Sequence, residues 1–176
     1  REKGEHIQVR TGFDELDDLT GGLYRGELAV LSGRPSMGKT AVALHMALQA
    51  ARAGWNTLYF SIEMSEEEVT ERILSMLSGV EAGKIRFKGT NREERALLEK
   101  AAAELAGLPL RIVYCGSLAI DEIRAVLMTR KARRELDIFF IDYLNLIHIP
   151  YTRGSRNETT NLALGCLLYT SPSPRD

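Results

Sequence analysis

The sequence lacks several features that would define a protein class by themselves. Its 176 residues hold two cysteines, Cys115 and Cys166, whose spacing fits neither a metal site nor a C-x-x-C motif. Such a pair is typical of a reducing compartment. No apolar run approaches the ~18 residues of a membrane span, and no signal peptide opens the chain. We therefore expect a cytoplasmic protein without a disulfide framework and without membrane contact.

An excess of charge of either sign is also missing. Lys and Arg total 23 and Asp and Glu total 24, which gives a formal net charge of -1. Without a bulk basic field, any binding of nucleic acid must be local. Histidine is scarce, and His45 falls in a helical pattern that is typical of a packed or half-exposed residue rather than a ligand. The hydrophobic fraction of 44% fits a globular domain with a sizeable core.

What is present is a glycine-bounded loop. Residues 33–40 match G-x-x-x-x-G-K-(S/T), the phosphate-binding loop, without a mismatch. Gly33 and Gly38 let backbone N–H groups approach a triphosphate, and the following helix points its positive dipole end at the phosphates. Lys39 would reach the β- and γ-phosphates, and the Thr40 hydroxyl would bind Mg²⁺. We expect the whole loop to contact nucleotide: Gly33, Arg34, Pro35, Ser36, Met37, Gly38, Lys39 and Thr40.

The loop lies in the context that this chemistry requires, because strand and helix patterns alternate along the chain. Strands are predicted over residues 27–32, 56–62, 109–115 and 137–141, the first of them fully buried. Helices are predicted over residues 14–19, 40–53, 65–78, 90–106 and 120–135. This alternation predicts one α/β domain, with a mostly parallel sheet and helices on both faces. A chance match in a surface loop would lack these neighbours.

Local signals mark helix starts and one connector. Ser65 with Glu68, and Thr90 with Glu93, have the spacing of capping boxes. The connector between these helices, residues 79–89, carries the basic residues Lys84, Arg86 and Lys88. A solvated linker is favoured over a nucleic-acid contact for this cluster.

Hydrolysis needs a partner for Mg²⁺ and a group that orients the attacking water. Asp142 ends the most apolar strand pattern, as in a Walker B motif. Ligands lie beyond the carboxyl ends of parallel strands, which favours a Mg²⁺ role for Asp142 over a strand-terminating turn. Glu63 directly follows the strand pattern of residues 58–62. If that strand lies beside the loop strand, Glu63 faces the γ-phosphate and could activate water. The same pattern also fits an alternative in which Glu63 is a surface residue ahead of a helix and has no catalytic role.

At this point the sequence resembles the DnaB family of replicative helicases. The resemblance is carried by residues 11–17 with 20–23 (the approach to that family's first strand), 34–41 (its phosphate loop), 61–65 (its segment with the catalytic glutamate) and 142–147 (its Walker B segment). Gln is usual in the family at the position of Asn145. The resemblance covers residues 7–165, and four motifs in the right order are more specific than the loop alone.

The resemblance implies a RecA-like P-loop NTPase fold and the ATPase core of a hexameric ring. Such a ring binds ATP and Mg²⁺ between subunits, moves along single-stranded DNA while unwinding duplex, and contacts a primase and a helicase loader. By this match Lys39 and Thr40 hold phosphate and Mg²⁺, Glu63 activates water and Asp142 completes the metal site. Arg153 and Arg156 resemble the start of the DNA-binding loop region, although a disordered polar loop fits them equally.

The two ends of the sequence predict a fragment. The chain starts without Met and in the middle of a pattern, so residues 1–165 are expected to form a partial RecA-like domain. Residues 166–176 continue no element and resemble a translated adapter, a non-native tail. Because the arginine finger and much of the DNA-binding region would lie elsewhere, we expect weak ATP·Mg²⁺ binding and negligible turnover from this piece.

Two other classes stay open. A RecA-like recombinase or clock-type ATPase would share the loop, but residues 61–65 argue against it. A non-enzymatic nucleotide-binding accessory module would also share the loop, but the intact Glu63 and Asp142 argue against that reading.

Overall fold

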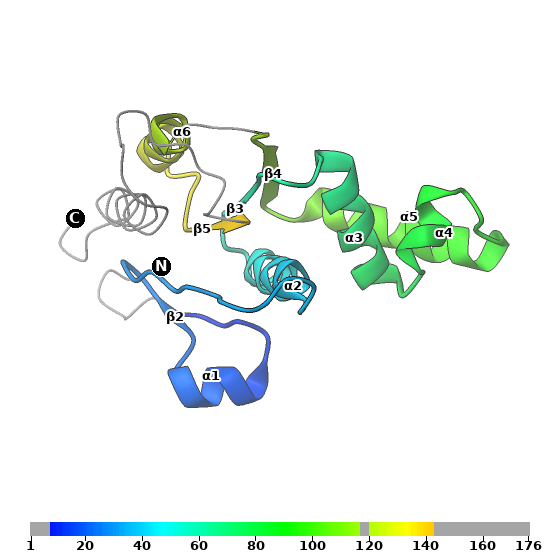
Figure 1. Ribbon diagram of the computed structural model, residues 1–176, viewed down its shortest axis with the longest axis horizontal. Coiled ribbons are helices and arrows are strands. Elements are labelled where there is room, and N and C mark those ends of the chain that lie inside the picture. Colours follow the sequence, from blue (N-terminus) through cyan, green and yellow to red (C-terminus); the bar gives the residue numbers. More distant parts are fainter. Residues whose placement is uncertain (1–7, 117–119, 143–176) are drawn as a thin grey trace.

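A parallel sheet forms the centre of the molecule (Figure 1). The computed structural model describes residues 8–116 and 120–142. Within this part, the sheet has three strands in the order β4-β3-β5. The strands are β3 (Thr57–Ser61), β4 (Leu110–Tyr114) and β5 (Ile138–Asp142). Ser61 lies opposite Tyr114 on one side and Asp142 on the other, so the carboxyl ends of all three strands meet at one edge.

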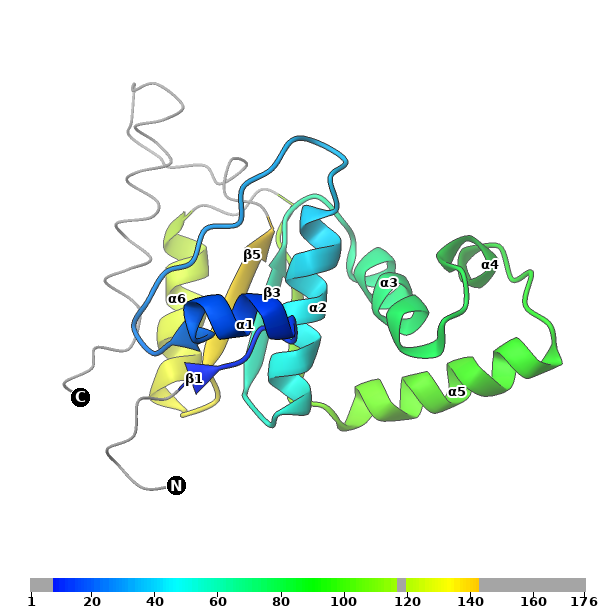
Figure 2. The ribbon, with the colours of Figure 1, turned by 90° about the horizontal axis from the view of Figure 1, so that it is seen from below.

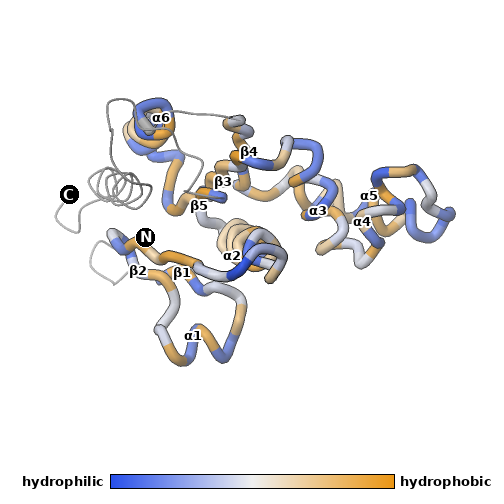
Figure 3. Tube along the Cα trace, in the orientation of Figure 1, coloured by the Kyte–Doolittle hydropathy of each residue, from blue (hydrophilic) through white to orange (hydrophobic). Residues whose placement is uncertain are grey.

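Helices cover both faces of the sheet, as predicted (Figure 2). They are α2 (Lys39–Arg52) and α3 (Glu66–Ser78) on one face and α6 (Ile120–Ala132) on the other. Successive strand side chains point to opposite faces. Tyr59 therefore packs with Leu44 of α2, whereas Leu58 and Phe60 pack with Ile123 of α6. In Figure 3 hydrophobic residues lie along α2 and β5, which are in contact through Phe140.

The connector between α3 and the next long helix, α5 (Arg92–Gly107), contains a short helix that the sequence did not predict. This helix is α4 (Ala82–Arg86), and with α5 it extends away from the sheet (Figure 2). Lys84 Nζ lies 2.6 Å from Glu94 Oε1, and Arg86 pairs with Glu68. Two members of the predicted basic cluster therefore form ion pairs within the domain, which accords with a structural role rather than a nucleic-acid contact.

One of the two predicted capping boxes is in the predicted place. The Glu68 N–H donates to Ser65 Oγ and the Ser65 N–H donates to Glu68 Oε2, each over 3.2 Å. The second box is shifted by one residue, because Asn91 caps α5 and pairs with Glu94. The prediction of a box from Thr90 to Glu93 is wrong. Thr90 and Asn91 are both able to cap, consecutive glutamates fit either register, and asparagine is the better N-cap.

The predicted strand over residues 27–32 is also wrong. These residues form no strand in the structure, and Val30 and Leu31 are 62% and 50% exposed. A strand is stabilised by hydrogen bonds to a neighbour. In the described part of the chain the outer edges of β4 and β5 carry no further strand, yet this segment pairs with neither of them. Residues 27–32 are apolar, but an apolar composition does not determine whether a segment finds a strand to pair with.

A small antiparallel ribbon precedes this segment. It consists of β1 (Gln8–Val9) and β2 (Leu23–Tyr24), and between them lies the predicted helix α1 (Asp14–Thr20). The unit contacts α2 through the rings of Phe13 and His45, whose centroids are 4.5 Å apart. His45 is half-buried at this contact, as predicted for a packed helix residue. Among the helices of the described part, none is long and apolar enough to cross a membrane.

A buried carboxylate ties the turn before α1 to that helix. Asp17 Oδ1 accepts the Thr11 N–H over 2.8 Å, and Oδ2 accepts the Gly12 N–H over 3.2 Å. Burial by itself raises the pKa of Asp17, but these hydrogen bonds and the nearby Arg10 charge outweigh it and lower the pKa below its usual value. The ionised form is therefore stabilised by folding.

Replacing Asp17 with asparagine is expected to lower the free energy of unfolding by about 1–3 kcal/mol at neutral pH, because the new amide N–H₂ would face a backbone N–H. The native pKa lies below the unfolded one, so the contribution of Asp17 is present above about pH 4 and is lost as the pH falls through the native pKa. Urea unfolding across this pH range measures the difference. Asp18→Asn, at a side chain that is 80% exposed, is the matched control and should change little. Equal stability of both variants at pH 7 would contradict the prediction.

Candidate nucleotide-binding site

The glycine-bounded loop leads directly into the first turn of α2. Gly38 has φ +84°, the left-handed region that favours glycine, and Ser36 also has a positive φ of 62°. Gly38 is the N-cap of α2, and no side chain caps this helix. Its first turn also lacks acidic residues. The N–H groups of this turn therefore remain available to an anion, in contrast to α3 and α5, where the N-cap side chain already accepts one first-turn N–H.

Lys39 folds back onto the loop. Its Nζ donates to the Gly33 carbonyl oxygen over 3.0 Å and to the Arg34 carbonyl oxygen over 2.9 Å. Both acceptors are neutral, and a phosphate oxygen would form a stronger, charge-assisted bond with the ammonium group. At Gly33 the φ is not left-handed, and an added Cβ would make only ordinary contacts, with the Lys39 side chain at 3.5 Å and Met37 Cβ at 4.0 Å. The role of Gly33 in letting backbone N–H groups approach a triphosphate therefore stays a prediction.

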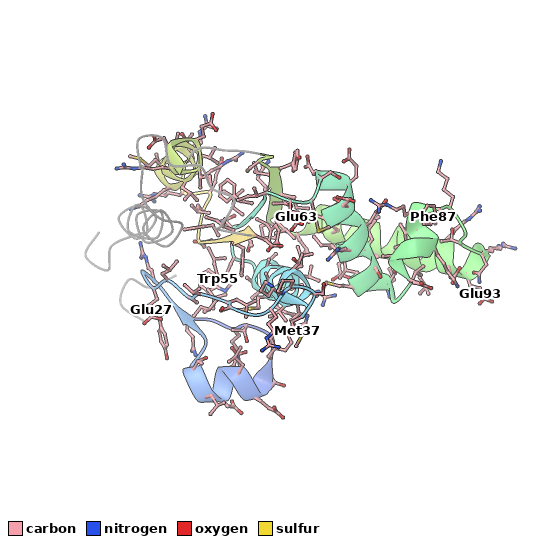
Figure 4. All side chains as sticks on the ribbon, viewed as in Figure 1. Glu27, Met37, Trp55, Glu63, Phe87 and Glu93 are labelled. Atoms are coloured by element: carbon pink, nitrogen blue, oxygen red, sulfur yellow. The ribbon has the colours of Figure 1, made fainter. Side chains whose placement is uncertain are left out.

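The turn that carries Glu63 is held by a buried serine. Ser61 Oγ donates to the Met64 carbonyl oxygen over 2.6 Å, and the Met64 N–H approaches the same Oγ at 3.3 Å. Glu63 lies between these residues, is exposed, and lies next to the start of α3 (Figure 4). The sequence prediction singled out Glu63 but missed Ser61. The sequence feature that could have indicated Ser61 is its hydroxyl at the last position of the strand, where the side chain can form hydrogen bonds with the backbone of the following turn.

The sequence argument for Glu63 made its role depend on a neighbouring loop strand. That condition is not met, because the neighbours of β3 are β4 and β5. Glu63 nevertheless follows β3 at the carboxyl edge of the sheet, and the Ile62 N–H donates to the Asp142 carbonyl oxygen over 2.9 Å. The structure thus brings Glu63 and Asp142 to the ends of adjacent strands.

Asp142 faces the same side of the sheet as α2. In the register of the sheet Tyr59 lies opposite Phe140, and Asp142 follows two residues later, so these side chains share one face. The Tyr59 hydroxyl donates to Asp142 Oδ2 over 3.0 Å. Burial raises the pKa of Tyr59 well above its usual value, and the Asp142 carboxylate raises it further, so the phenol is protonated at neutral pH. Sequence reasoning missed Tyr59, because the contact depends on which strands are paired.

The loop and the two acidic residues lie at one end of the molecule. Figure 2 shows the N-terminal end of α2 beside the carboxyl ends of β3 and β5. Within the described residues, no group of three or more His, Cys, Asp or Glu could hold a metal by itself. The predicted DNA contacts Arg153 and Arg156, and the predicted tail of residues 166–176, lie outside the described residues.

A parallel sheet with helices on both faces, and a glycine-bounded loop at its carboxyl edge, define an α/β domain of the RecA-like class. Two solved structures share the fold. One, described as an ATPase domain, has a TM-score of 0.84 at 27% identity and covers 95% of this chain and 60% of its own. The other, a DnaB-like replicative helicase described with its interactions with primase, also has a TM-score of 0.84, at 26% identity, and covers 95% of this chain and 41% of its own.

Residues 8–164 match the family described as DnaB-like helicase C terminal domain, and the chain belongs to this family. It is 36% identical over 148 residues to the replicative DNA helicase DnaB of Treponema pallidum (strain Nichols), covering 84% of this chain and 34% of that protein. It is 34% identical over 145 residues to the Geobacillus stearothermophilus DnaB, covering 82% of this chain and 32% of that protein. The chain thus spans about a third of the length of these curated relatives. The predicted RecA-like fold and family are confirmed.

Proposed function

We propose that this chain is the motor portion of a replicative DNA helicase, which couples ATP hydrolysis to movement along single-stranded DNA and to duplex unwinding. One observation carries the proposal: within a DnaB-like domain, the uncapped N-terminus of α2 lies at the same end of the sheet as Glu63 and Asp142. A motor needs all three elements in one place, because hydrolysis requires phosphate binding, metal binding and an activated water.

The loop would bind the ATP phosphates. Residues 33–40, apart from Pro35, would supply backbone N–H groups, and the left-handed Gly38 leads the loop into the first turn of α2. Lys39 would exchange its two carbonyl partners for the β- and γ-phosphates. The site fits a polyanion because it combines an ammonium group with a helix end that holds no acid.

Thr40 and Asp142 would hold Mg²⁺ together with oxygens of the nucleotide. This donor set suits magnesium, which usually takes one or two carboxylates along with substrate phosphates. When bound, the ion would supply neutralisation of phosphate charge. Glu63, on the turn fixed by Ser61, would accept a proton from the attacking water.

The parent protein would act as a homohexameric ring in the cytoplasm, with single-stranded DNA, a primase and a helicase loader as partners. A relative described with its interactions with primase supports the primase contact. Residues 1–165 would form part of the motor domain, with Arg153 and Arg156 near DNA, and residues 166–176 would be a non-native tail.

The test is ATP hydrolysis by the full reading frame, measured with and without single-stranded DNA. Strong stimulation by DNA is expected, because translocation couples each hydrolysis event to the strand. Hydrolysis that is indifferent to DNA would instead indicate a clock-type or regulatory ATPase. Binding of ATP without any hydrolysis would indicate an accessory module.

A further inference from the structure

Tyr59 is a buried residue whose hydroxyl contacts Asp142 at the carboxyl edge of the sheet. It lies on the central strand β3, its relative exposure is 0%, and its ring packs among Leu44 of α2 and Val69 and Ile73 of α3. The ring of Phe140 is stacked beside it at a centroid distance of 6.3 Å. A ring packed from two helices and a neighbouring strand has one available position, and its hydroxyl is fixed with it.

That hydroxyl reaches diagonally to the end of the next strand. Tyr59 is paired with Phe140, and the O–H donates to Oδ2 of Asp142, two residues further along β5. The bond occupies one carboxylate oxygen. Among residues 8–116 and 120–142, the other oxygen, Oδ1, accepts no hydrogen bond. The buried phenol therefore selects one orientation of the carboxylate, in which Oδ2 faces Tyr59.

We propose that Tyr59 is the positioning residue for Asp142, and that it fixes this carboxylate for the metal–nucleotide site. The inference rests on the proposed metal role of Asp142. Tyr59 itself does not contact the reacting atoms, since its hydroxyl is engaged with Oδ2 and its ring is enclosed by α2, α3 and Phe140. Partners of metal ligands commonly contribute about tenfold to a hundredfold in metal affinity, because they hold the ligand in its binding orientation.

A purely structural reading of Tyr59 is distinct and makes a different prediction. In that reading Asp142 only satisfies a buried hydroxyl, so removal of the hydroxyl changes stability but not metal binding. In the positioning reading the effect of Tyr59 on metal binding requires the carboxylate, so it disappears once the Asp142 carboxylate is removed. A double-mutant cycle separates the two readings.

The experiment uses Tyr59→Phe, Asp142→Asn and the double variant in the full reading frame, with Mn²⁺ as the probe. Free Mn²⁺ is followed by electron paramagnetic resonance with ATP no more concentrated than the protein sites, because excess ATP would itself bind the ion. ATP binding in EDTA reports the folded, loop-competent fraction. Phenylalanine keeps the ring and its packing. Tyr114→Phe is the matched control, because Tyr114 ends the other neighbouring strand, opposite Ser61, and is 52% exposed.

Tyr59→Phe is expected to weaken Mn²⁺ binding about tenfold, with ATP binding in EDTA unchanged and no further loss when it is added to Asp142→Asn. Tyr114→Phe should match the parent protein. Parent-like Mn²⁺ affinity in Tyr59→Phe, alongside a clear loss in Asp142→Asn, would overturn the positioning role and leave the proposed function standing. An additive loss in the double variant would also overturn it. Parent-like affinity in Asp142→Asn would overturn the proposed metal site itself.

Discussion

Replacing Lys39 with alanine is expected to abolish measurable ATP binding, with a loss of affinity of at least about a hundredfold. The ammonium group lies at the start of α2, where its partners are the carbonyl oxygens of Gly33 and Arg34. Hydrogen bonds to charged groups contribute about 1.5–3 kcal/mol each, and two phosphate contacts therefore account for a change of this size. Titration of a fluorescent ATP analogue against the full reading frame measures it.

Two controls separate this loss from a general loss of charge or of fold. Lys100→Ala removes an exposed lysine from the middle of α5, far along the sequence from the loop, and should bind ATP as the parent does. The urea midpoint of Lys39→Ala should stay close to that of the parent, because both bonds of Lys39 are exposed. ATP affinity within about twofold of the parent in Lys39→Ala would refute the assignment of the loop.

Replacing Glu63 with glutamine is expected to preserve ATP binding and to lower the hydrolysis rate by about 10²–10⁴-fold, the usual contribution of a general base. Glutamine keeps the size of the side chain, and the turn around it is held by Ser61 rather than by Glu63. The fold should therefore be unchanged while the proton acceptor is lost. Single-turnover hydrolysis in the presence of single-stranded DNA, in the full reading frame, isolates the chemical step.

The matched control for this variant is Glu67→Gln. Glu67 is an exposed glutamate in the first turn of α3, four positions after Glu63, and it has no role in the proposed mechanism. We expect the parent rate for Glu67→Gln. Hydrolysis at the parent rate in Glu63→Gln would show that another group activates the water, and would leave the binding assignments intact.

The prediction for the loop could be made from sequence because its requirements are local. A glycine before the helix, a lysine at its start and a following helix that is apolar on nearly all sides are all encoded within about twenty residues. The structure bears out the left-handed Gly38 and the start of α2 at Lys39. The same locality explains why Ser65 and Glu68 were read correctly as a capping box.

Features that depend on which strands pair could not be predicted from local sequence. The apolar segment of residues 27–32 has the composition of a strand, yet it pairs with no described strand, although the outer edges of β4 and β5 carry no further strand there. The register of β3 against β5 joins Tyr59 to Asp142 across 83 positions of sequence. No periodicity in either segment carries that information.

The sequence by itself determined the α/β class, the family, the phosphate loop and the identity of the acidic residues, because each rests on local periodicity or on a short motif. The tertiary structure decided the strand order, the common edge shared by Glu63 and Asp142, and the contact of Asp142 with Tyr59. The physical reason is that hydrogen bonds between strands are made by backbone groups that every residue carries. Which strands become neighbours is therefore settled by how the helices and strands pack together.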